Sequence, residues 1–316
     1  MVELLHGAGK QKNPVRSKSS ESSYSLMEFM KDFPDDDACL RWLWLNRYSI
    51  DGTHAHCPKC DKERAFKQYK TKQRRQSWTC TGCGYHLQVT SGTIFEQSST
   101  SLHLWFYAIY LMTSTRCGLS AKQLEREIGV TYKTAWRMLN KIRNELMTED
   151  DEPLTGEVEV DETSIEGKPK KHLNWSEAAK LRERSRTTVI AAVERGRRVK
   201  ATVIPSRRGP QLRQQVIDWV DPTAIIYTDE WPAYNFVKGH FAEHSLINHS
   251  RRYVDGDIHT NTVEGFFGNL KTGIRGNCKK VSRKWLQGYL NEFTWRYNHR
   301  HEKVMFHALL LRATRR

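Results

Sequence analysis

The sequence has no long hydrophobic run and no hydrophobic segment at its start. A membrane-spanning helix needs about 20 consecutive apolar residues, whereas the longest apolar stretch, 102–112, is shorter and contains His103. The opening residues, MVELLHGAGKQK, lack the apolar core of a secretory signal peptide. These absences disfavour an exported or membrane-bound protein. We therefore expect a cytoplasmic, nucleoid-associated protein that has no membrane partner.

Acidic residues are too few to balance the basic ones. Asp and Glu number 36 against 51 Lys and Arg, which gives a formal net charge of +15. Such an excess favours a polyanionic partner, most often nucleic acid. The chain has 316 residues, 38% of them hydrophobic, which is enough for two or three domains with real cores.

Cysteine is sparse, and its arrangement predicts a metal site. Four of the seven cysteines form two CxxC pairs, at Cys57, Cys60, Cys80 and Cys83. The spacing C-x2-C-x19-C-x2-C is typical of a zinc ribbon, because each two-residue gap lets two thiolates from one tight turn reach a common ion. We expect one structural Zn²⁺ held by all four thiolates, with no open position for chemistry.

The N-terminal part is predicted to contain three kinds of structure. Residues 1–24 form a disordered basic tail, because they are rich in Lys, Ser and Gly. Residues 25–99 form a helical lead-in followed by the zinc ribbon. The segment KQYKTKQRRQSW between the two cysteine pairs is basic with interleaved aromatics. This pattern fits either a DNA-contacting ribbon or a solvated face.

Residues 100–147 are predicted to form a helical, DNA-binding domain with a helix-turn-helix. Gly129 marks the turn, and the apolar spacing before and after it indicates two helices with inner faces. Capping of the second helix by Thr131 would leave Tyr132, Lys133 and Arg137 exposed for contacts with a groove or with phosphates. An ordinary helical hairpin is the alternative interpretation.

Residues 148–156 are predicted to be a linker, and residues 157–316 a second domain with C-terminal helices and a basic insertion at 166–186. Its expected elements are strands at 157–165, 187–193, 199–204 and 224–228, and a helix at 210–220. Asp161 is expected where the first strand ends, and Asp229 directly follows the fourth strand. Two acidic residues at the ends of paired strands would be neighbours.

The segment 258–276 is predicted to form a helix that carries a third acidic residue. At 100° per residue, Glu264, Gly268, Lys271 and Arg275 fall on one face, and an apolar stripe lies beside them. Gly268 leaves room on this face for a phosphate backbone. Asn261 followed by Glu264 also matches a capping box, in which the glutamate only satisfies the start of the helix.

Together, Asp161, Asp229 and Glu264 predict a metal-dependent phosphoryl-transfer site in a ribonuclease-H-like α/β fold, with a mixed sheet flanked by helices. Three clustered acids repel one another unless cations neutralise them, and two Mg²⁺ or Mn²⁺ ions suit carboxylate ligands with open positions for phosphate oxygens. Lys271 and Arg275 lie on the face of Glu264, where Lys271 would neutralise a phosphate near the scissile bond.

The sequence resembles the DDE transposases of bacterial insertion sequences, in the zinc-ribbon group with an ISXO-type catalytic domain. The resemblance covers about residues 26–307. It rests on the segments VEVDET (158–163), YTDEWPAY (227–234), HTNTVEGFFGNLKTGIRG (259–276) and YLNEFTWRYNHR (289–300). It implies a homo-oligomeric enzyme that binds the terminal inverted repeats of double-stranded DNA, cleaves there, and transfers a strand to target DNA. Some relatives have Asn at the third acidic position, and Glu264 here favours an active metal site.

Two other functions fit the same residues. A regulator could use the zinc ribbon and the helix-turn-helix with an inactive second domain, but it would not need Asp161, Asp229, Glu264 and Lys271 together. A hydrolytic nuclease would use all four residues without strand transfer, and only its reaction products distinguish it from a transposase.

Overall fold

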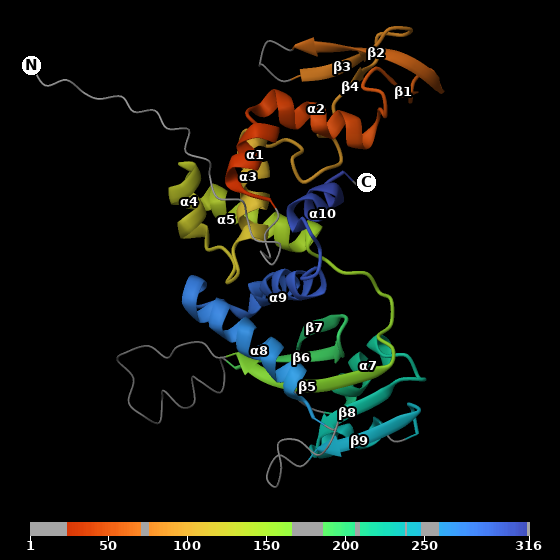
Figure 1. Cartoon of the computed structure of the whole chain (residues 1–316), viewed down its shortest axis with the longest axis vertical. Helices are drawn as coiled ribbons and strands as arrows, with labels where there is room; N and C mark the ends of the chain where they lie inside the picture. The colour runs from red at the N-terminus through yellow and green to blue at the C-terminus, as the bar shows by residue number, and fades with distance from the viewer. Residues whose placement is uncertain are drawn as a thin grey trace, which may run out of the picture.

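Two bodies of secondary structure follow one another along the chain in this computed structural model (Figure 1). The structure describes residues 24–70, 76–165, 186–205, 209–237, 239–247 and 259–314. The predicted basic tail except residue 24, and the predicted insertion at 166–186 except residue 186, therefore lie outside the described residues. Within them, no helix is both long and apolar enough to cross a membrane.

The first body combines helices with a small antiparallel sheet of order β1-β2-β3-β4. Its elements are α1 (Leu26–Asp32), α2 (Asp36–Arg47), β1 (His54–Cys57), β2 (Lys62–Lys70), β3 (Gln76–Cys80), β4 (His86–Leu87), α3 (Leu102–Ser114), α4 (Ala121–Ile128), α5 (Tyr132–Lys141) and the π-helical turn η1 (Ile142–Leu146). Asp35 caps α2 by accepting a hydrogen bond from the backbone N–H of Ala38, as expected for an acidic residue at a helix N-terminus.

One hydrophobic core joins the small sheet to the helices. Trp78 of β3 stacks on Trp44 of α2, with ring centroids 4.9 Å apart and planes 8° apart. The same core contains Phe106 of α3 and Leu139 of α5. The boundary predicted near residue 100 therefore does not separate two cores, because the sheet has too little apolar surface to pack without α2.

Helices α4 and α5 are joined by a short turn at the predicted glycine. Gly129 adopts a left-handed conformation with φ of 67°, which glycine reaches without a steric penalty. Thr131 caps α5 by accepting a hydrogen bond from the N–H of Thr134 at 3.3 Å. Leu124 and Leu139, predicted for the inner faces, are fully buried.

The second body is a five-stranded sheet of order β7-β6-β5-β8-β9 with helices on both faces. From residue 157 onward, the elements in chain order are β5 (Glu157–Ile165), β6 (Thr187–Glu194), β7 (Val199–Ile204), α7 (Gly209–Trp219), β8 (Ile225–Asp229), the 3₁₀ turn η2 (Pro232–Val237), β9 (Glu243–Ile247), α8 (Asn261–Gly273), the π-helical turn η3 (Ile274–Cys278), α9 (Arg283–Asn298) and α10 (Met305–Arg312). Strands β5, β6 and β7 pair antiparallel, while β8 and β9 run parallel to β5. The predicted mixed sheet is thus present, although β9 was not predicted.

Side chains along β5 point alternately to the two faces of the sheet. Val158 and Val160 pack with Leu212 and Val216 of α7 on one face. On the other face, the stripe predicted for the late helix packs with β6, and Val263 of α8 belongs to the same core as residues of α9. The acidic residues of β5 at odd positions therefore lie on the face that α8 covers.

The last helix returns to the first body. Phe306, Leu309 and Leu310 of α10 belong to the core of α1, α2 and α3, and α10 lies beside α3 (Figure 1). Tyr24 stacks on Phe306, with ring centroids 5.3 Å apart. By packing, α10 is thus part of the first body, whereas the sequence placed all residues from 157 to 316 in one domain.

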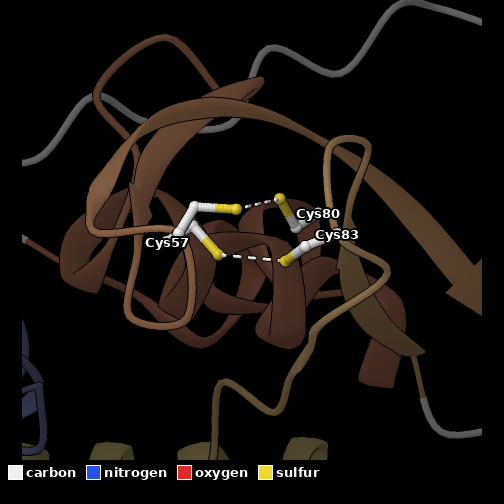
Figure 2. Close-up of side chains that lie close together, drawn as sticks. Cys57, Cys80 and Cys83 are labelled. Carbon is white, nitrogen blue, oxygen red and sulfur yellow. Dashed lines mark hydrogen bonds between the residues drawn. The ribbon is translucent and has the colours of Figure 1, made fainter.

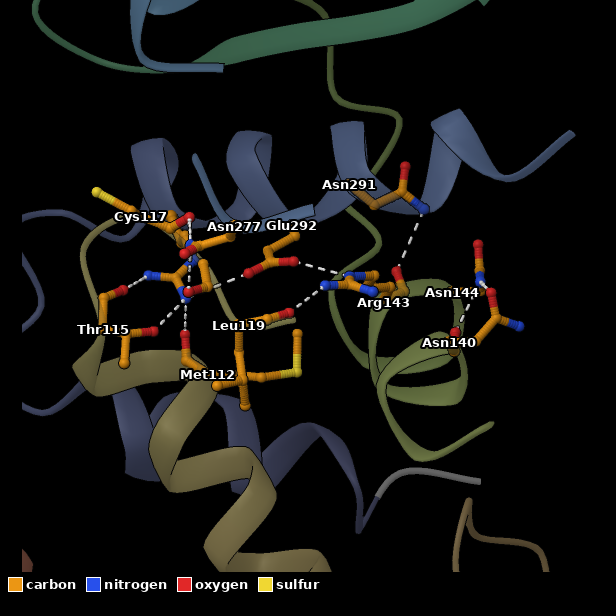
Figure 3. Close-up of polar contacts among 12 residues, drawn as sticks. Met112, Thr115, Cys117, Leu119, Asn140, Arg143, Asn144, Asn277, Asn291 and Glu292 are labelled. Atoms are coloured by element: carbon orange, nitrogen blue, oxygen red, sulfur yellow. Dashed lines mark hydrogen bonds and ion pairs between the residues drawn. The ribbon is translucent and has the colours of Figure 1, made fainter. Parts of the chain in front are cut away.

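A buried polar network joins the two bodies through α9 (Figure 3). Arg143 of η1 donates to Glu292 of α9 at 2.7 Å, and both side chains are almost fully buried. Arg143 also donates to the carbonyl of Leu119 at 2.9 Å, and Arg296 donates to the carbonyl of Thr115. Gly118, at φ +82°, leaves no room for a Cβ, which would lie 2.9 Å from Glu292 Oε1. This network fixes α9, and with it the sheet, against α3 and η1.

Candidate catalytic and metal sites

The four cysteines of the predicted zinc ribbon form one cluster (Figure 2). All four sulfur atoms lie within 4.8 Å of one another. The Sγ atoms of Cys57 and Cys83 are 3.7 Å apart, and those of Cys60 and Cys80 are 3.9 Å apart. A tetrahedral site with Zn–S distances of about 2.3 Å has sulfur–sulfur edges of about 3.8 Å. The four thiols therefore fit a closed zinc site.

The two CxxC turns have the same backbone hydrogen bond. In the first, the N–H of Asp61 donates to the carbonyl of Cys57 at 2.8 Å. In the second, the N–H of Gly84 donates to the carbonyl of Cys80 at 3.0 Å. Both residues at the donating position are left-handed, with φ of 53° for Asp61 and 70° for Gly84. These matching turns aim the two pairs of sulfurs at a common point.

The two strand carboxylates lie beside each other at one edge of the sheet. Strands β5 and β8 are parallel neighbours, and their pairing ends with Glu159 opposite Tyr227. Asp161 and Asp229 each stand two residues further, on the same face as these partners. Asp229 ends β8 as predicted. Asp161 does not end β5, because the antiparallel pairing with β6 continues to Ile165; it lies where the pairing with β8 stops.

Asp161 is the electrostatic centre of this edge. Burial, together with the charges of Glu162, Asp229 and Glu264, raises the pKa of Asp161 to about 7, although a hydrogen bond from the backbone N–H of Glu162 at 2.7 Å acts to lower it. Like charges this close disfavour ionisation of Asp161 unless a cation compensates them. The carboxylates of Asp229 and Glu264 thus act on Asp161 although both are distant in the chain.

Glu264 lies in the first turn of α8 but does not form a capping box. The helix begins at Asn261, its N-cap is Thr260, and no side chain of that cap bonds to it. The Thr260 hydroxyl instead donates to Glu264 Oε1 at 3.3 Å. The capping-box interpretation is therefore wrong. Glu264 is exposed, about a quarter-turn around α8 from the buried Val263.

The three acids are near one another without being in mutual ligand contact. Over the described part of the chain, the cysteine cluster is the only group of three or more His, Cys, Asp or Glu ligand atoms that all lie within 4.8 Å. The charges of Asp229 and Glu264 thus act on Asp161, but the carboxylate oxygens of the three acids do not all lie within 4.8 Å of one another.

The predicted DNA-contacting residues occupy two exposed surfaces. On α5, Tyr132, Lys133 and Arg137 are exposed, and the ammonium of Lys122 lies over the Tyr132 ring at 5.5 Å. On α8 and η3, Gly268 and Arg275 are exposed and Lys271 is partly buried. A Cβ added to Gly268 would meet no atom within 4 Å.

Sequence reasoning missed the polar residues that support the acidic edge. The hydroxyl of Tyr234, in η2, donates to the buried Glu162 at 2.6 Å. Glu159 is fully buried on β5 and binds Arg195 at 2.8 Å. The one available signal was the run of acids at alternate positions of a strand, which is costly for a buried face unless partners are supplied.

A comparison with known families identifies the second body. Residues 153–298 match the model of a family described as the ISXO2-like transposase domain. This match supports an insertion-sequence transposase, as the resemblance of the sequence predicted. The matched segment includes β5, β8 and α8 with all three acids, while the four cysteines lie outside it.

Two curated relatives agree with the family. A protein of Halobacterium salinarum, named "Uncharacterized protein in transposable element ISH50", is 28% identical over 257 residues, which cover 76% of this chain and 84% of the relative. An "Uncharacterized transposase-like protein" of Haemophilus influenzae is 25% identical over 101 residues, covering 32% of this chain and 81% of the relative. The printed names of both relatives agree with the family whose model matches residues 153–298.

Proposed function

We propose that this protein is a DNA transposase that binds terminal inverted repeats and carries out metal-dependent cleavage and strand transfer. The observation that carries the proposal is that three carboxylates influence one another electrostatically at one edge of the sheet. All three lie inside a segment that matches a transposase family. The strand order β7-β6-β5-β8-β9, with three antiparallel strands followed by two parallel ones, supports a ribonuclease-H-like architecture for this domain.

Asp161, Asp229 and Glu264 would hold two Mg²⁺ or Mn²⁺ ions. Their oxygen donors suit a hard cation, and the raised pKa of Asp161 indicates a site that gains from added positive charge. Bound there, the metal supplies charge stabilisation to the attacking and leaving oxygens of a phosphodiester. Lys271 would contact a neighbouring phosphate, and the open space at Gly268 admits the backbone that carries it.

The cysteine cluster would hold one structural Zn²⁺. A closed site with four thiolates leaves no position for water or substrate, so its role is to fold the small sheet. Because Trp78 of this sheet packs on α2, zinc would also stabilise the first body as a whole.

Helices α4 and α5 would act as a helix-turn-helix that reads double-stranded DNA. The exposed Tyr132, Lys133 and Arg137 at the start of α5 are placed for a groove and its phosphates. Lys271 and Arg275 would bind DNA nearer the acids. Cleavage of two transposon ends and their joining to target DNA would require a homo-oligomer, at least a dimer.

The decisive experiment uses the purified protein, labelled DNA that ends in candidate inverted repeats, Mg²⁺ and an unlabelled target plasmid. Cut ends and joined products are scored in one reaction, with EDTA and a scrambled repeat as controls. Repeat-dependent cutting with joining is the expected result. Cutting without joining would indicate a hydrolytic nuclease, and binding without either would indicate a regulator.

A further inference from the structure

The first turn of α8 is capped by a residue of another element. The first N–H groups of a helix have no partner within the helix, and the N-cap residue of α8 supplies no side-chain acceptor. Glu159 of β5 does so instead. Its Oε2 accepts hydrogen bonds from the backbone N–H groups of Thr262 at 2.8 Å and Val263 at 3.1 Å. Its Oε1 accepts the Thr262 hydroxyl at 2.8 Å.

Glu159 therefore connects two acid-bearing elements directly. It lies two residues before Asp161 on the same face of β5, and the residues it caps directly precede Glu264 in α8. The carboxylate is fully buried. A buried charge persists only when partners compensate it; here the positive end of α8 and a guanidinium do so.

Arg195 supplies that guanidinium and extends the connection to the third element. Its Nε donates to Glu159 Oε1 at 2.8 Å, and its Nη2 donates to the carbonyl of His259 at 3.0 Å, just before α8. Its Cζ lies over the ring of Tyr227 at 4.2 Å. Tyr227 stands two residues before Asp229 on β8. The Glu159–Arg195 pair thus contacts the elements that carry all three acids.

We propose that Glu159 and Arg195 are positioning residues that set the relative placement of Asp161, Asp229 and Glu264. The inference rests on the proposed function, because it assigns the pair to a metal site. The gross position of α8 is already fixed by its buried stripe, which includes Val263, Phe267 and Leu270. The polar pair therefore controls the first turn of α8, where Glu264 lies, rather than the packing of the whole helix.

The test compares Glu159→Gln with Glu157→Gln. Glu157 is a matched control: it lies on the same face of β5 and binds Arg195 at 2.6 Å, yet it makes no hydrogen bond to α8 within the described residues. Glutamine keeps the size of the side chain but loses the charge and replaces one acceptor with a donor. Thr262→Val removes one of the three hydrogen bonds from α8 and serves as a milder variant, should Glu159→Gln not fold.

Three measurements separate a positioning role from a purely structural one. Amide hydrogen exchange of the metal-free protein reports the cap at Thr262 and Val263, Mn²⁺ titration followed by EPR reports the site, and DNA cleavage reports the reaction. We expect Glu159→Gln to speed exchange at these two amides and to weaken Mn²⁺ affinity or cleavage by about 10–100-fold, the usual cost of losing a residue that orients metal ligands. Thr262→Val should change the same quantities less, and Glu157→Gln should resemble the wild type.

Unchanged exchange in Glu159→Gln would overturn the cap. Faster exchange with wild-type Mn²⁺ affinity and cleavage would overturn the positioning role and leave a structural one. An equal effect of Glu157→Gln would assign the result to Arg195 alone. A wild-type protein that binds Mn²⁺ but does not cut DNA contradicts the proposed function only, since exchange and Mn²⁺ affinity still decide the role of Glu159.

Discussion

The cysteine cluster and the acidic edge of the sheet bring their ligand atoms together over very different lengths of chain. Cys57 and Cys83 are 26 positions apart, and their sulfurs lie 3.7 Å from each other on two matching turns. The acids stretch from residue 161 to residue 264 and come from two strands and a helix. Short-range turns determine the first site, whereas the second depends on the whole sheet and on α8.

The two sites also differ in how closely their side-chain atoms are grouped. The sulfurs already have the spacing of a zinc tetrahedron, while the three carboxylates do not form a group within 4.8 Å. Burial and the neighbouring carboxylates disfavour the charge of Asp161 and raise its pKa. The four sulfurs are thus the more closely grouped set of side chains, and the acids are the set whose charges oppose one another.

Cys57→Ser should break the first site with the largest effect. Structural zinc contributes about 10–16 kcal/mol of apparent binding free energy in small zinc-folded peptides, so losing one of four thiolates should release the metal and unfold the small sheet. Zinc released per protein and thermal unfolding are the measurements. Cys117→Ser is the control, because Cys117 is exposed and outside the cluster. Full zinc content in Cys57→Ser would contradict the assignment.

Asp161→Asn should break the second site while leaving the fold intact. If Asp161 is a metal ligand as proposed, cleavage should fall by more than the roughly 100-fold that loss of an outer partner can cost. The metal-free protein should unfold at the wild-type temperature or above it near pH 7–8. The sign follows from the raised pKa: the ionised carboxylate is less stable in the folded chain than in the unfolded one, and Asn removes that charge.

Glu157→Gln is again the control, since Glu157 shares the strand face but not the acidic edge. Undiminished cleavage by Asp161→Asn would remove Asp161 from the site. A large drop in the unfolding temperature would show that Asp161 stabilises the fold, as we expect of the cysteines. The two sites would then not differ in their contribution to stability.

Local patterns predicted the elements and the cysteine site well. The alternation in EVEVDETSI gave β5 with the bounds observed, and the CxxC spacing gave the cluster, because each depends on neighbours in the chain. The stripe of α8 was likewise buried as predicted. Asp229 was placed at the end of β8 because a short apolar strand ends where its polar residues begin.

Long-range partners were out of reach of the same reasoning. Nothing in the sequence near Asn261 shows that its helix is capped by Glu159, about a hundred residues earlier, and the local capping-box pattern suggested the wrong partner. Asp161 was wrongly expected at the end of its strand, because only the pairing of β5 with β8 stops near it, while the pairing with β6 continues to Ile165. Likewise, the short apolar run of α10 does not reveal that it packs on α3.

Arg137→Ala tests whether recognition of DNA, like the cysteine site, depends on a local element. Arg137 is exposed on α5. If it reads a base, its loss should weaken binding to the repeat by about 1–3 kcal/mol and relax specificity at one position. Titration of labelled repeat and scrambled DNA by anisotropy measures both effects. Arg41→Ala, an exposed arginine on α2, is the control. Unchanged repeat binding would move recognition to the small sheet.

Gly268→Ala should have the smallest effect on cleavage, and it tests whether DNA lies against α8 beside the acidic residues. A glycine inside an exposed helix costs about 1 kcal/mol relative to alanine, and the Cβ that this substitution adds would meet no protein atom within 4 Å. The variant should therefore raise the stability of the free protein by up to about 1 kcal/mol. A DNA backbone that lies against this face between Glu264 and Lys271 would meet the added methyl, so cleavage should fall although stability rises.

Gly209→Ala is the matched control, because Gly209 has equally open surroundings at the start of α7, on the opposite face of the sheet. If both alanines leave cleavage unchanged, no backbone approaches α8 at residue 268, and the DNA path must run elsewhere along the acidic edge.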